Sequence, residues 1–505
     1  MNQLKKGALL SYLNIILSNA IGIVMTPFII RSLGNSEYGL YTLIGSFVTY
    51  LTLMDLGLNN TIVRFVAKYR AENDKNGEEV FLGTTMKIYL YISLVLTFIG
   101  ILLYFNLDFI FSKSLTANEL EKAKIMFAIL VLDIAIALPG GTFAAICNAY
   151  EYFVFPRAIN ITRYLIRATL FFLVIYNGGK AISIVIIDTI LNIIVLLTTI
   201  TFVFKTIKVK FNFMSIDKKL LRQIFNYSIW IFLLGIVSQF FWNAGQVVLG
   251  IQTNTKIIAI YGVGITLGGY YGAFAGAINS VFLPKATKMS ISNSNFELTQ
   301  AMTKLGRISF IVLMYIFIAF LFFGQEFIAL WVGNTYADSW LIALLIMIVY
   351  TIPLIQNFGH SLLEAKNKVR IKFIIYIIFI SLGITTGAIL SKTLNGLGMA
   401  IGICSGWAIA QVFINYCFIK ILKLELLYFF KELFLSKLTL SVLLSAIIAF
   451  YINSIGFDSW GLFSLKIMLF SVVFSLLLYF IGINTFEMQL FSEPFAFLKK
   501  NKNEG

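Results

Sequence analysis

The sequence predicts an all-α membrane protein that crosses the bilayer about fourteen times. Hydrophobic residues make up 59% of the chain and charged residues only 12%, whereas a soluble domain is nearer half apolar and a quarter charged. The apolar residues also gather into stretches of roughly 18–25 residues, each long enough to cross a bilayer core at 1.5 Å of rise per residue. These two observations exclude an ordinary soluble protein.

The expected spans follow one another along the whole chain with short connections. They begin near residues 9, 38, 81, 123, 157, 181, 224, 255, 306, 340, 371, 396, 438 and 462. The first apolar run follows a Lys pair, as in a signal peptide. It is too long for one, however, and no small-residue cleavage site follows, so we expect a retained first helix.

Only every second connection is rich in Lys and Arg. The basic connections include 64–75, 205–222, 283–289 and 366–372, and the carboxyl-terminal tail is basic as well. Because cytoplasmic loops retain basic residues, we expect a multi-pass protein of a bacterial cytoplasmic (inner) membrane with both termini in the cytoplasm. The net charge of +16 then reflects topology and attraction to anionic membrane lipids, and we expect no nucleic-acid partner.

A weak internal repeat predicts two parallel lobes of six helices each. A shift of 220 residues places Tyr41 on Tyr261 and Asn59 on Asn279, and both copies run through a span into a basic connection. Six spans separate the copies, so both keep the same direction, and a central cavity should lie between the lobes. The expected division is an amino-terminal lobe (1–204), a cytoplasmic linker (205–223), a carboxyl-terminal lobe (224–420) and two further helices with a tail (421–505).

The sequence lacks the residue patterns of common enzymes and metal-binding sites. The chain has a single histidine and no complete phosphate-binding P-loop. Its cysteines, Cys147, Cys404 and Cys417, lie in or beside apolar segments without the spacing of a metal site. The outer connections are too short for a catalytic domain. We therefore expect a protein that is not an enzyme and that has no metal site and no cofactor, although H⁺ or Na⁺ could serve as a coupling ion.

Ionisable residues inside apolar spans are the main candidate functional residues, because each costs a few kcal/mol at mid-bilayer unless it is paired or hydrated. The first lobe contains Lys87, Arg163, Arg167, Asp55, Asp133 and Asp188. The spacing of the two arginines places both on one helix face. Two interpretations stay open. The arginines pair with Asp133 or Asp188 to hold helices together, or they line a hydrated cavity and bind an anionic group, since a guanidinium suits phosphate.

Other polar residues have weaker claims. Asp55, Asp133 and Asp188 could bind the coupling ion. Histidine as a residue type ordinarily titrates near neutral pH, so His360 could sense protons, although a lone histidine at a span end is commonly a packing residue. Gln239, Asn243 and Gln246 could bind sugar hydroxyls or join helices.

A stripe of small residues predicts close helix packing. It consists of Gly264, Gly268, Gly272, Gly276 and Ser280, one residue per helical turn. Small residues at this spacing let two helices approach closely, and they could also allow the helices to slide between states.

Three segments resemble bacterial oligosaccharide flippases. They are PFIIRSLGNSEYGLYTL (27–43), DLGLNNTIVRFVAKYRAENDK (55–75) and INSVFLPKATKM (278–289). The resemblance is to the polysaccharide-transport branch of the superfamily that also holds multidrug exporters and the lipid II flippase. It covers nearly the whole chain, including the number of spans.

The resemblance implies alternating-access transport of undecaprenyl-pyrophosphate-linked oligosaccharide, for a surface polymer such as O-antigen or capsule. A cationic cavity would hold the pyrophosphate and sugar, and the polysaccharide polymerase and glycosyltransferases of the pathway would be partners. Arg31, Asp55, Asn59, Arg64 and Lys68 match family positions. Relatives often carry an acid where this chain has Gly245–Gln246, so coupling through that helix is doubtful here.

We therefore expect two sets of site residues. The substrate-binding candidates are Arg163, Arg167, Arg64, Arg31, Gln239, Asn243 and Gln246. The ion-coupling candidates are Asp55, Asp133, Asp188 and His360. The alternatives are a cation-coupled multidrug exporter, which would favour unpaired intramembrane acids, and a membrane glycosyltransferase or ligase, which the short outer connections disfavour.

Overall fold

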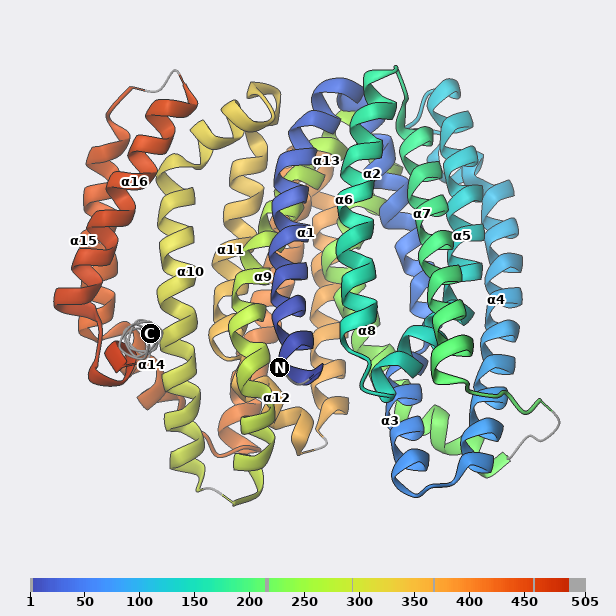
Figure 1. The fold of residues 1–505 in the computed structure, drawn as a ribbon. Coiled ribbons are helices and arrows are strands. Elements are labelled where there is room, and N and C mark those ends of the chain that lie inside the picture. Colours follow the sequence, from blue (N-terminus) through green and yellow to red (C-terminus); the bar gives the residue numbers. More distant parts are fainter. Residues whose placement is uncertain (1–2, 214–217, 293, 367, 457–458, 490–505) are drawn as a thin grey trace, which may run out of the picture. The chain divides into compact units, whose positions relative to one another are not determined.

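The computed structural model describes residues 3–213, 218–292, 294–366, 368–456 and 459–489, and in these residues it is helical and contains no strand (Figure 1). It forms two compact units: unit 1 comprises residues 1–262 and 380–403, and unit 2 comprises residues 263–379 and 404–505. These units do not coincide with the two predicted six-helix lobes, so the lobe division stays a prediction.

The helices of the amino-terminal half lie in unit 1. They are α1 (Gln3–Leu33), α2 (Asn35–Thr49), the 3₁₀-helix η1 (Tyr50–Asp55), α3 (Leu58–Ala71), α4 (Lys75–Phe111), α5 (Ala117–Ala149), α6 (Val154–Tyr176), α7 (Ala181–Phe202), the π-helical turn η2 (Val203–Ile207) and α8 (Lys218–Gln252). Local signals explain their starts. Asp74 caps α4 by accepting from the Gly77 N–H, and Thr116 and Glu119 form a capping box at α5.

The remaining helices begin with α9, whose first residues belong to unit 1. They are α9 (Thr255–Ser292), α10 (Asn295–Trp331), η3 (Asn334–Tyr336), α11 (Asp338–Ile355), α12 (Asn357–Ala365), α13 (Val369–Lys420), α14 (Leu426–Phe434), α15 (Lys437–Asn453), α16 (Trp460–Leu477) and η4 (Leu478–Gly482). The predicted stripe on α9 packs at three positions. Gly264, Gly268 and Gly272 each leave room for one side chain of α11. Gly276 has open space around it, and the side chain of Ser280 lies outside the described residues.

The structure confirms the predicted number of spans. Twelve helices of the described residues are long and apolar enough to cross a membrane. One of them, α13, makes two passes, because its backbone turns at Asn395 (φ 50°) and Gly402 then packs against Gly387. The α14–α15 pair, bent by 42°, supplies one more. The part of the chain that the structure describes is therefore all-α, with fourteen apolar passes.

Within unit 1, alternate connections meet at the same end of the bundle. We call one end the basic end. It holds the α3–α4 connection, the α5–α6 connection and the segment after η2. These contact one another, because Arg70 donates to the Ala149 carbonyl at 2.6 Å and the Asn212 N–H donates to the Glu79 carbonyl at 2.9 Å. This is the side on which the sequence gathers its Lys and Arg.

The opposite end of unit 1 is joined by polar contacts between helix starts. Glu37 at the start of α2 is buried, pairs with Lys122 of α5 at 2.5 Å and accepts from the first N–H of α7 at 3.2 Å. Thr255 at the start of α9 donates to Glu119 at 2.9 Å and lies against Gly39 of α2. The tip between α8 and α9 is thus docked onto the starts of α2 and α5.

Candidate functional site

The neighbouring helices α6 and α7 present charged and polar side chains to each other at one-turn spacing. Arg163 and Arg167 lie four residues apart on α6, and Asp188 and Asn192 lie four residues apart on α7. Because residues at this spacing share one face of a helix, the two pairs form a ladder within the apolar bundle. We call Arg163, Arg167, Asp188, Asn192 and Asp133 of α5 the charge cluster.

The first rung of this ladder is a two-point ion pair. Arg167 donates from Nε to Asp188 Oδ1 at 2.5 Å and from Nη2 to Oδ2 at 2.9 Å. Its guanidinium also lies over the Phe171 ring at 4.3 Å and hydrogen-bonds with the Tyr41 hydroxyl of α2. The parallel fork is the strongest arrangement for an arginine–carboxylate pair. The helix-joining interpretation therefore has a geometric basis at Arg167.

The second rung is less complete. Asn192 donates to Asp133 Oδ2 at 2.7 Å, and Arg163 is near enough to Asp133 for their charges to interact. The Arg163 Nε is nevertheless buried with no hydrogen-bond partner among the described residues. Because a buried donor without an acceptor costs about 1–3 kcal/mol, this arginine has hydrogen-bonding capacity that the helices leave unused.

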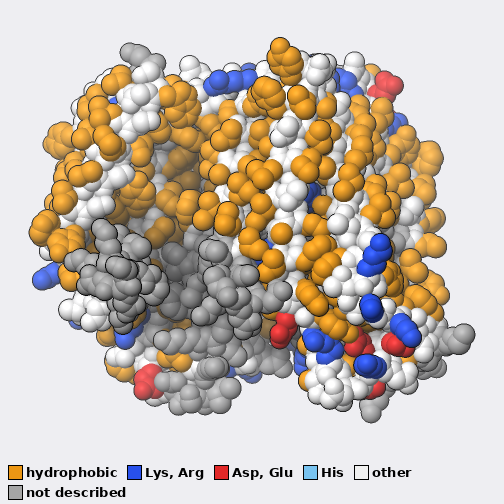
Figure 2. All heavy atoms as spheres, in the orientation of Figure 1, with side chains coloured by type: hydrophobic (Ala, Val, Ile, Leu, Met, Phe, Trp, Pro, Cys, Tyr) orange, Lys and Arg blue, Asp and Glu red, His pale blue; other side chains and the backbone are white. Residues whose placement is uncertain are grey.

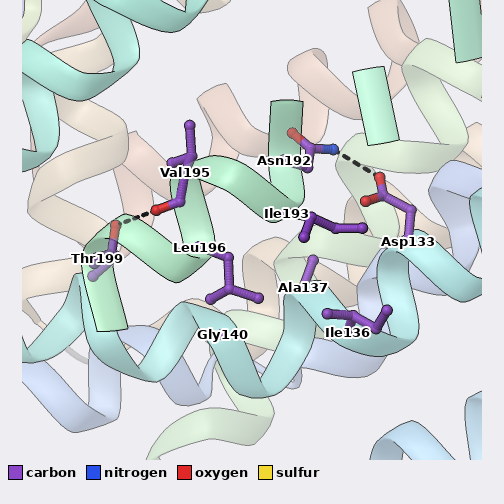
Figure 3. A pocket seen from close by; sticks show the side chains of 10 residues that line it. Asp133, Ile136, Ala137, Gly140, Asn192, Ile193, Val195, Leu196 and Thr199 are labelled. Atoms are coloured by element: carbon purple, nitrogen blue, oxygen red, sulfur yellow. Dashed lines mark hydrogen bonds between the residues drawn. The ribbon is translucent and has the colours of Figure 1, made fainter. Parts of the chain in front are cut away.

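A small cavity lies beside Asp133, between α5 and α7. Figure 3 shows Asp133 and Asn192 bonded at one end, and Thr199 at the other, where it donates to the Val195 carbonyl at 2.7 Å. The volume is about 220 Å³, below the roughly 300–1,000 Å³ of ordinary ligand pockets. It suits water or a hydrated cation better than a sugar headgroup. Among the described residues, no three His, Cys, Asp or Glu side chains are grouped as metal ligands.

Asp55 lies next to a break in the helix of the second span. The chain leaves helical geometry at Leu56 and Gly57, which have φ of 51° and 73°, and α3 restarts there. The Asp55 carboxylate accepts from the Tyr89 hydroxyl at 2.6 Å, from the Asn59 side chain at 2.8 Å and from backbone N–H groups of Gly57 and Asn59. It thereby accepts from the backbone at the start of α3, and its acceptor capacity is largely used.

The polar residues of α8 lie along one stretch of unit 1. Asn243 donates to Gln239 at 2.5 Å, and the Tyr50 hydroxyl donates to the Gln239 carbonyl at 3.3 Å. Gln246 is buried beside Gly262 of α9. The Asn243 bond lies within α8, and the contacts of Tyr50 and Gly262 join α8 to its neighbours. The sugar-binding role stays a prediction.

The remaining predicted residues lie apart from the charge cluster. Arg31 is exposed in the last turn of α1, and Arg64 is exposed on α3. His360 of α12 is buried in unit 2, against the rings of Phe418 and Tyr376. Neither of its ring nitrogens has a hydrogen-bond partner among the described residues. An imidazolium there would leave two buried donors unpaired, which favours a packing role.

Three polar residues with contacts inside the bundle were not identified from the sequence: two beside or within the charge cluster and one in unit 2. Asn192 could have been found, since it lies one turn beyond Asp188 on the same face of an apolar helix. Nothing in the local sequence marks Tyr41, because its contact with Arg167 depends on how α2 packs. Lys466 of α16 is buried and pairs with Glu326 of α10 at 2.6 Å, a match that needs the tertiary fold.

Solved transporter structures share this fold. The lipid II flippase MurJ in an inward closed conformation aligns with a TM-score of 0.70 at 15% identity, over 97% of this chain and 99% of that chain. The eukaryotic MATE transporter AtDTX14 aligns with a TM-score of 0.59 at 13% identity, over 83% and 96%. A MOP superfamily transporter from Pyrococcus furiosus gives 0.51 at 13% identity, over 82% and 92%.

The sequence comparisons add the family. A search of curated proteins found no match to this chain. The profile of the family described as "Polysaccharide biosynthesis protein" matches residues 4–290, more than half of the chain. This stretch includes all three segments that carried the resemblance, and the fold resembles that of the lipid II flippase MurJ. The chain is a multi-pass membrane protein that belongs to the polysaccharide biosynthesis protein family.

Proposed function

We propose that this protein is a flippase that moves undecaprenyl-pyrophosphate-linked oligosaccharide from the inner to the outer leaflet of a bacterial cytoplasmic membrane. The polymer built from the transported oligosaccharide is a surface polysaccharide such as O-antigen or capsule. Family membership and the MurJ-like fold support a lipid-linked substrate. Both termini are cytoplasmic in this proposal, the protein is not an enzyme, and the polymerase and glycosyltransferases of the pathway are its partners.

The observation that carries the proposal is a pair of arginines on one face of α6, of which Arg163 lacks a full set of acceptors and Arg167 is partly exposed. Arg163 keeps a buried, unpartnered Nε, and Arg167 keeps 26% of its side chain exposed despite its ion pair. A pyrophosphate offers oxygen acceptors to such donors. When it binds, Arg163 gains its missing acceptor and Arg167 can share its donors between Asp188 and the substrate, because charge-assisted bonds to phosphate are strong.

The coupling ion, H⁺ or Na⁺, is assigned to Asp133 in this proposal. Asp133 borders a cavity of hydrated-ion size and accepts a bond from Asn192. Its neighbour Arg163 offers a simple link between the two ligands, because a phosphate that draws Arg163 away would leave Asp133 free to take up a cation. Asp55, with its four donors, and His360, with its apolar surroundings, suit this role less well.

The test begins with deletion of the gene. One surface polysaccharide should disappear, and its lipid-linked repeat unit should accumulate at the cytoplasmic face of the membrane. Unchanged polymer together with increased sensitivity to cationic dyes would instead favour the multidrug exporter, the function that the fold shared with MATE transporters leaves as the alternative.

Complementation by matched variants then separates the two roles of the arginines. Arg167→Gln and Arg163→Gln should fail to restore the polymer at normal protein abundance. Asp188→Asn, which removes the partner but keeps the arginine, should restore it in part. If Arg167→Gln combined with Asp188→Asn restores the polymer, the pair is only a helix joint and the substrate role is rejected.

A further inference from the structure

A second cavity, of about 550 Å³, opens at the basic end of unit 1. Its walls come from the α3–α4 connection, the end of α5 and the segment after η2. The residues that matter here are Arg70, Lys75, Glu78, Tyr150, Lys208 and Lys210. Its volume falls within the range of ordinary ligand pockets, and it is separate from the charge cluster.

The segment that carries the two lysines is fixed against α4. The Asn212 N–H donates to the Glu79 carbonyl at 2.9 Å, and the Lys87 ammonium donates to the Phe213 carbonyl. Gly83 of α4 has no side chain where the Asn212 carbonyl passes, and a Cβ there would collide with it. This wall of the cavity is therefore held in place from three points.

The basic side chains of the cavity differ in how many contacts they make with the protein. Arg70 donates to the Ala149 carbonyl at 2.6 Å and stacks over the Tyr150 ring at 4.1 Å, while the Tyr150 hydroxyl donates to Glu78 at 2.7 Å. Lys208 and Lys210 are exposed, and their ammonium groups make no hydrogen bond or ion pair with any described residue. With Arg70 and Lys75 also in the lining against Glu78 and Glu79, the net charge is positive. The cavity suits an anion.

Exposed aromatic rings adjoin the lysines. Phe204 is 46% exposed and Phe213 is 47% exposed, and Phe211 contacts both, with ring centroids 5.9 and 6.1 Å apart. Inorganic phosphate gains nothing from an apolar patch beside its site, whereas a lipid can place its phosphate among the lysines and its apolar part on the rings. Figure 2 shows basic and acidic side chains gathered beside apolar ones over this end of α3 and α4.

We propose that this cavity binds the phosphate group of a membrane lipid headgroup, with Lys208 and Lys210 as its principal ligands. Two lipids carry that chemistry: an anionic phospholipid and a polyprenyl diphosphate carrier. The second source rests on the proposed function, because only a flippase of lipid-linked sugars would meet the carrier, whereas the first source does not.

The experiment titrates full-length protein in detergent with lipid and counts bound molecules by native mass spectrometry. The ligands are phosphatidylglycerol, undecaprenyl diphosphate and, as the lipid without net charge, phosphatidylcholine. Lys208→Gln combined with Lys210→Gln should weaken binding of the anionic lipid about tenfold or more, since each surface lysine contributes roughly 1 kcal/mol. Lys208→Arg with Lys210→Arg should keep the binding. Lys366→Gln with Lys368→Gln, which removes the same charge from another predicted inner connection, should leave it unchanged.

The outcomes separate the sources. A loss confined to phosphatidylglycerol assigns the cavity to phospholipid, and a loss confined to undecaprenyl diphosphate assigns it to the carrier. Unchanged affinity of the Lys208/Lys210 double variant for both lipids, or an equal loss in the Lys366/Lys368 control, overturns the proposal. So does full displacement of the lipid by inorganic phosphate at millimolar concentration. Binding in detergent requires no transport, so a failure of the flippase assay leaves the phospholipid result standing.

Discussion

The two units each contain an arginine–carboxylate pair, and the pairs differ in how fully the arginine is engaged. In unit 2, Arg307 of α10 donates to both oxygens of Glu487, at 2.6 and 3.2 Å. It also donates to the carbonyl oxygens of Glu432 and Gly482, at 3.0 and 3.3 Å. The exposed side-chain fractions are only 8% for Arg307 and 1% for Glu487. This pair joins α10 to the helices near the carboxyl end and leaves no room for a ligand.

The pair in unit 1 begins with the same two-point contact but ends differently. Arg167 and Asp188 keep exposed side-chain fractions of 26% and 18%, and one turn away Arg163 has an unpartnered Nε. The difference teaches that an intramembrane arginine is not functional merely because it is buried. The useful question is how many of its five N–H donors already have acceptors in the protein.

The largest expected effect on stability follows from breaking the Arg307–Glu487 pair, whose arginine donors already have acceptors in the protein. Arg307→Ala leaves Glu487 buried without its partner, and removal of one member of a buried pair costs about 3–5 kcal/mol. We expect a severe fall in the yield of folded protein and in the unfolding temperature in detergent. Arg307→Met with Glu487→Leu should recover much of the loss. A single variant as stable as the wild type would contradict the saturated arrangement.

The Glu326–Lys466 pair of unit 2 should respond less strongly. Both side chains are buried, so Lys466→Met again leaves a lone carboxylate, but that carboxylate can take up a proton instead of remaining charged. We expect a loss of about 2–3 kcal/mol. Adding Glu326→Gln should restore part of it, as measured by thermal unfolding at pH 7. A double variant less stable than the single one would count against the pairing.

The Arg167–Asp188 pair of unit 1 should matter less for stability than the Arg307–Glu487 pair, and more for transport. Because both side chains are partly exposed, Arg167→Gln should cost about 1–2 kcal/mol, well below the cost of Arg307→Ala, while it abolishes complementation. Measuring unfolding temperature and polymer level on the same preparations separates the two effects. Equal destabilisation by Arg167→Gln and Arg307→Ala would erase the contrast between the units.

The smallest expected effect concerns Thr255, which joins the α8–α9 tip to Glu119 at 2.9 Å and to Ser36 at 3.4 Å. Thr255→Val removes these bonds at an expected cost of about 0.5–1.5 kcal/mol. If the proposed transport cycle releases this tip, Ser36→Cys with Thr255→Cys should cross-link on oxidation and stop transport reversibly. The native cysteines are buried and should not interfere. Continued transport by the cross-linked protein would show that the tip stays docked.

Much of the fold could be predicted because long apolar runs and basic connections are local features of the sequence. All fourteen predicted span starts fall on helices of the structure. The break after Asp55 was not predicted, since the Tyr89 hydroxyl reaches the Asp55 carboxylate only after α4 packs against this segment. The partners of the intramembrane arginines could not be predicted either. The sequence offered Arg163 and Arg167 two acids, and the choice of Asp188 for Arg167 depends on the rotation of α7 against α6.

The glycine stripe of α9 has a consequence for motion. Gly264, Gly268 and Gly272 accommodate Ile342, Ile346 and Tyr350 of α11 in order, and a Cβ on these glycines would lie 2.6–2.7 Å from its partner. Both series repeat every four residues, so a slip of α9 by four residues, about 6 Å at 1.5 Å per residue, would move each side chain to the next glycine. Tyr350 would then face Gly276, which already has open space. The matching repeats would place a glycine opposite each of the three side chains in a second register as well, so α9 could slide along α11 without opening the apolar interface.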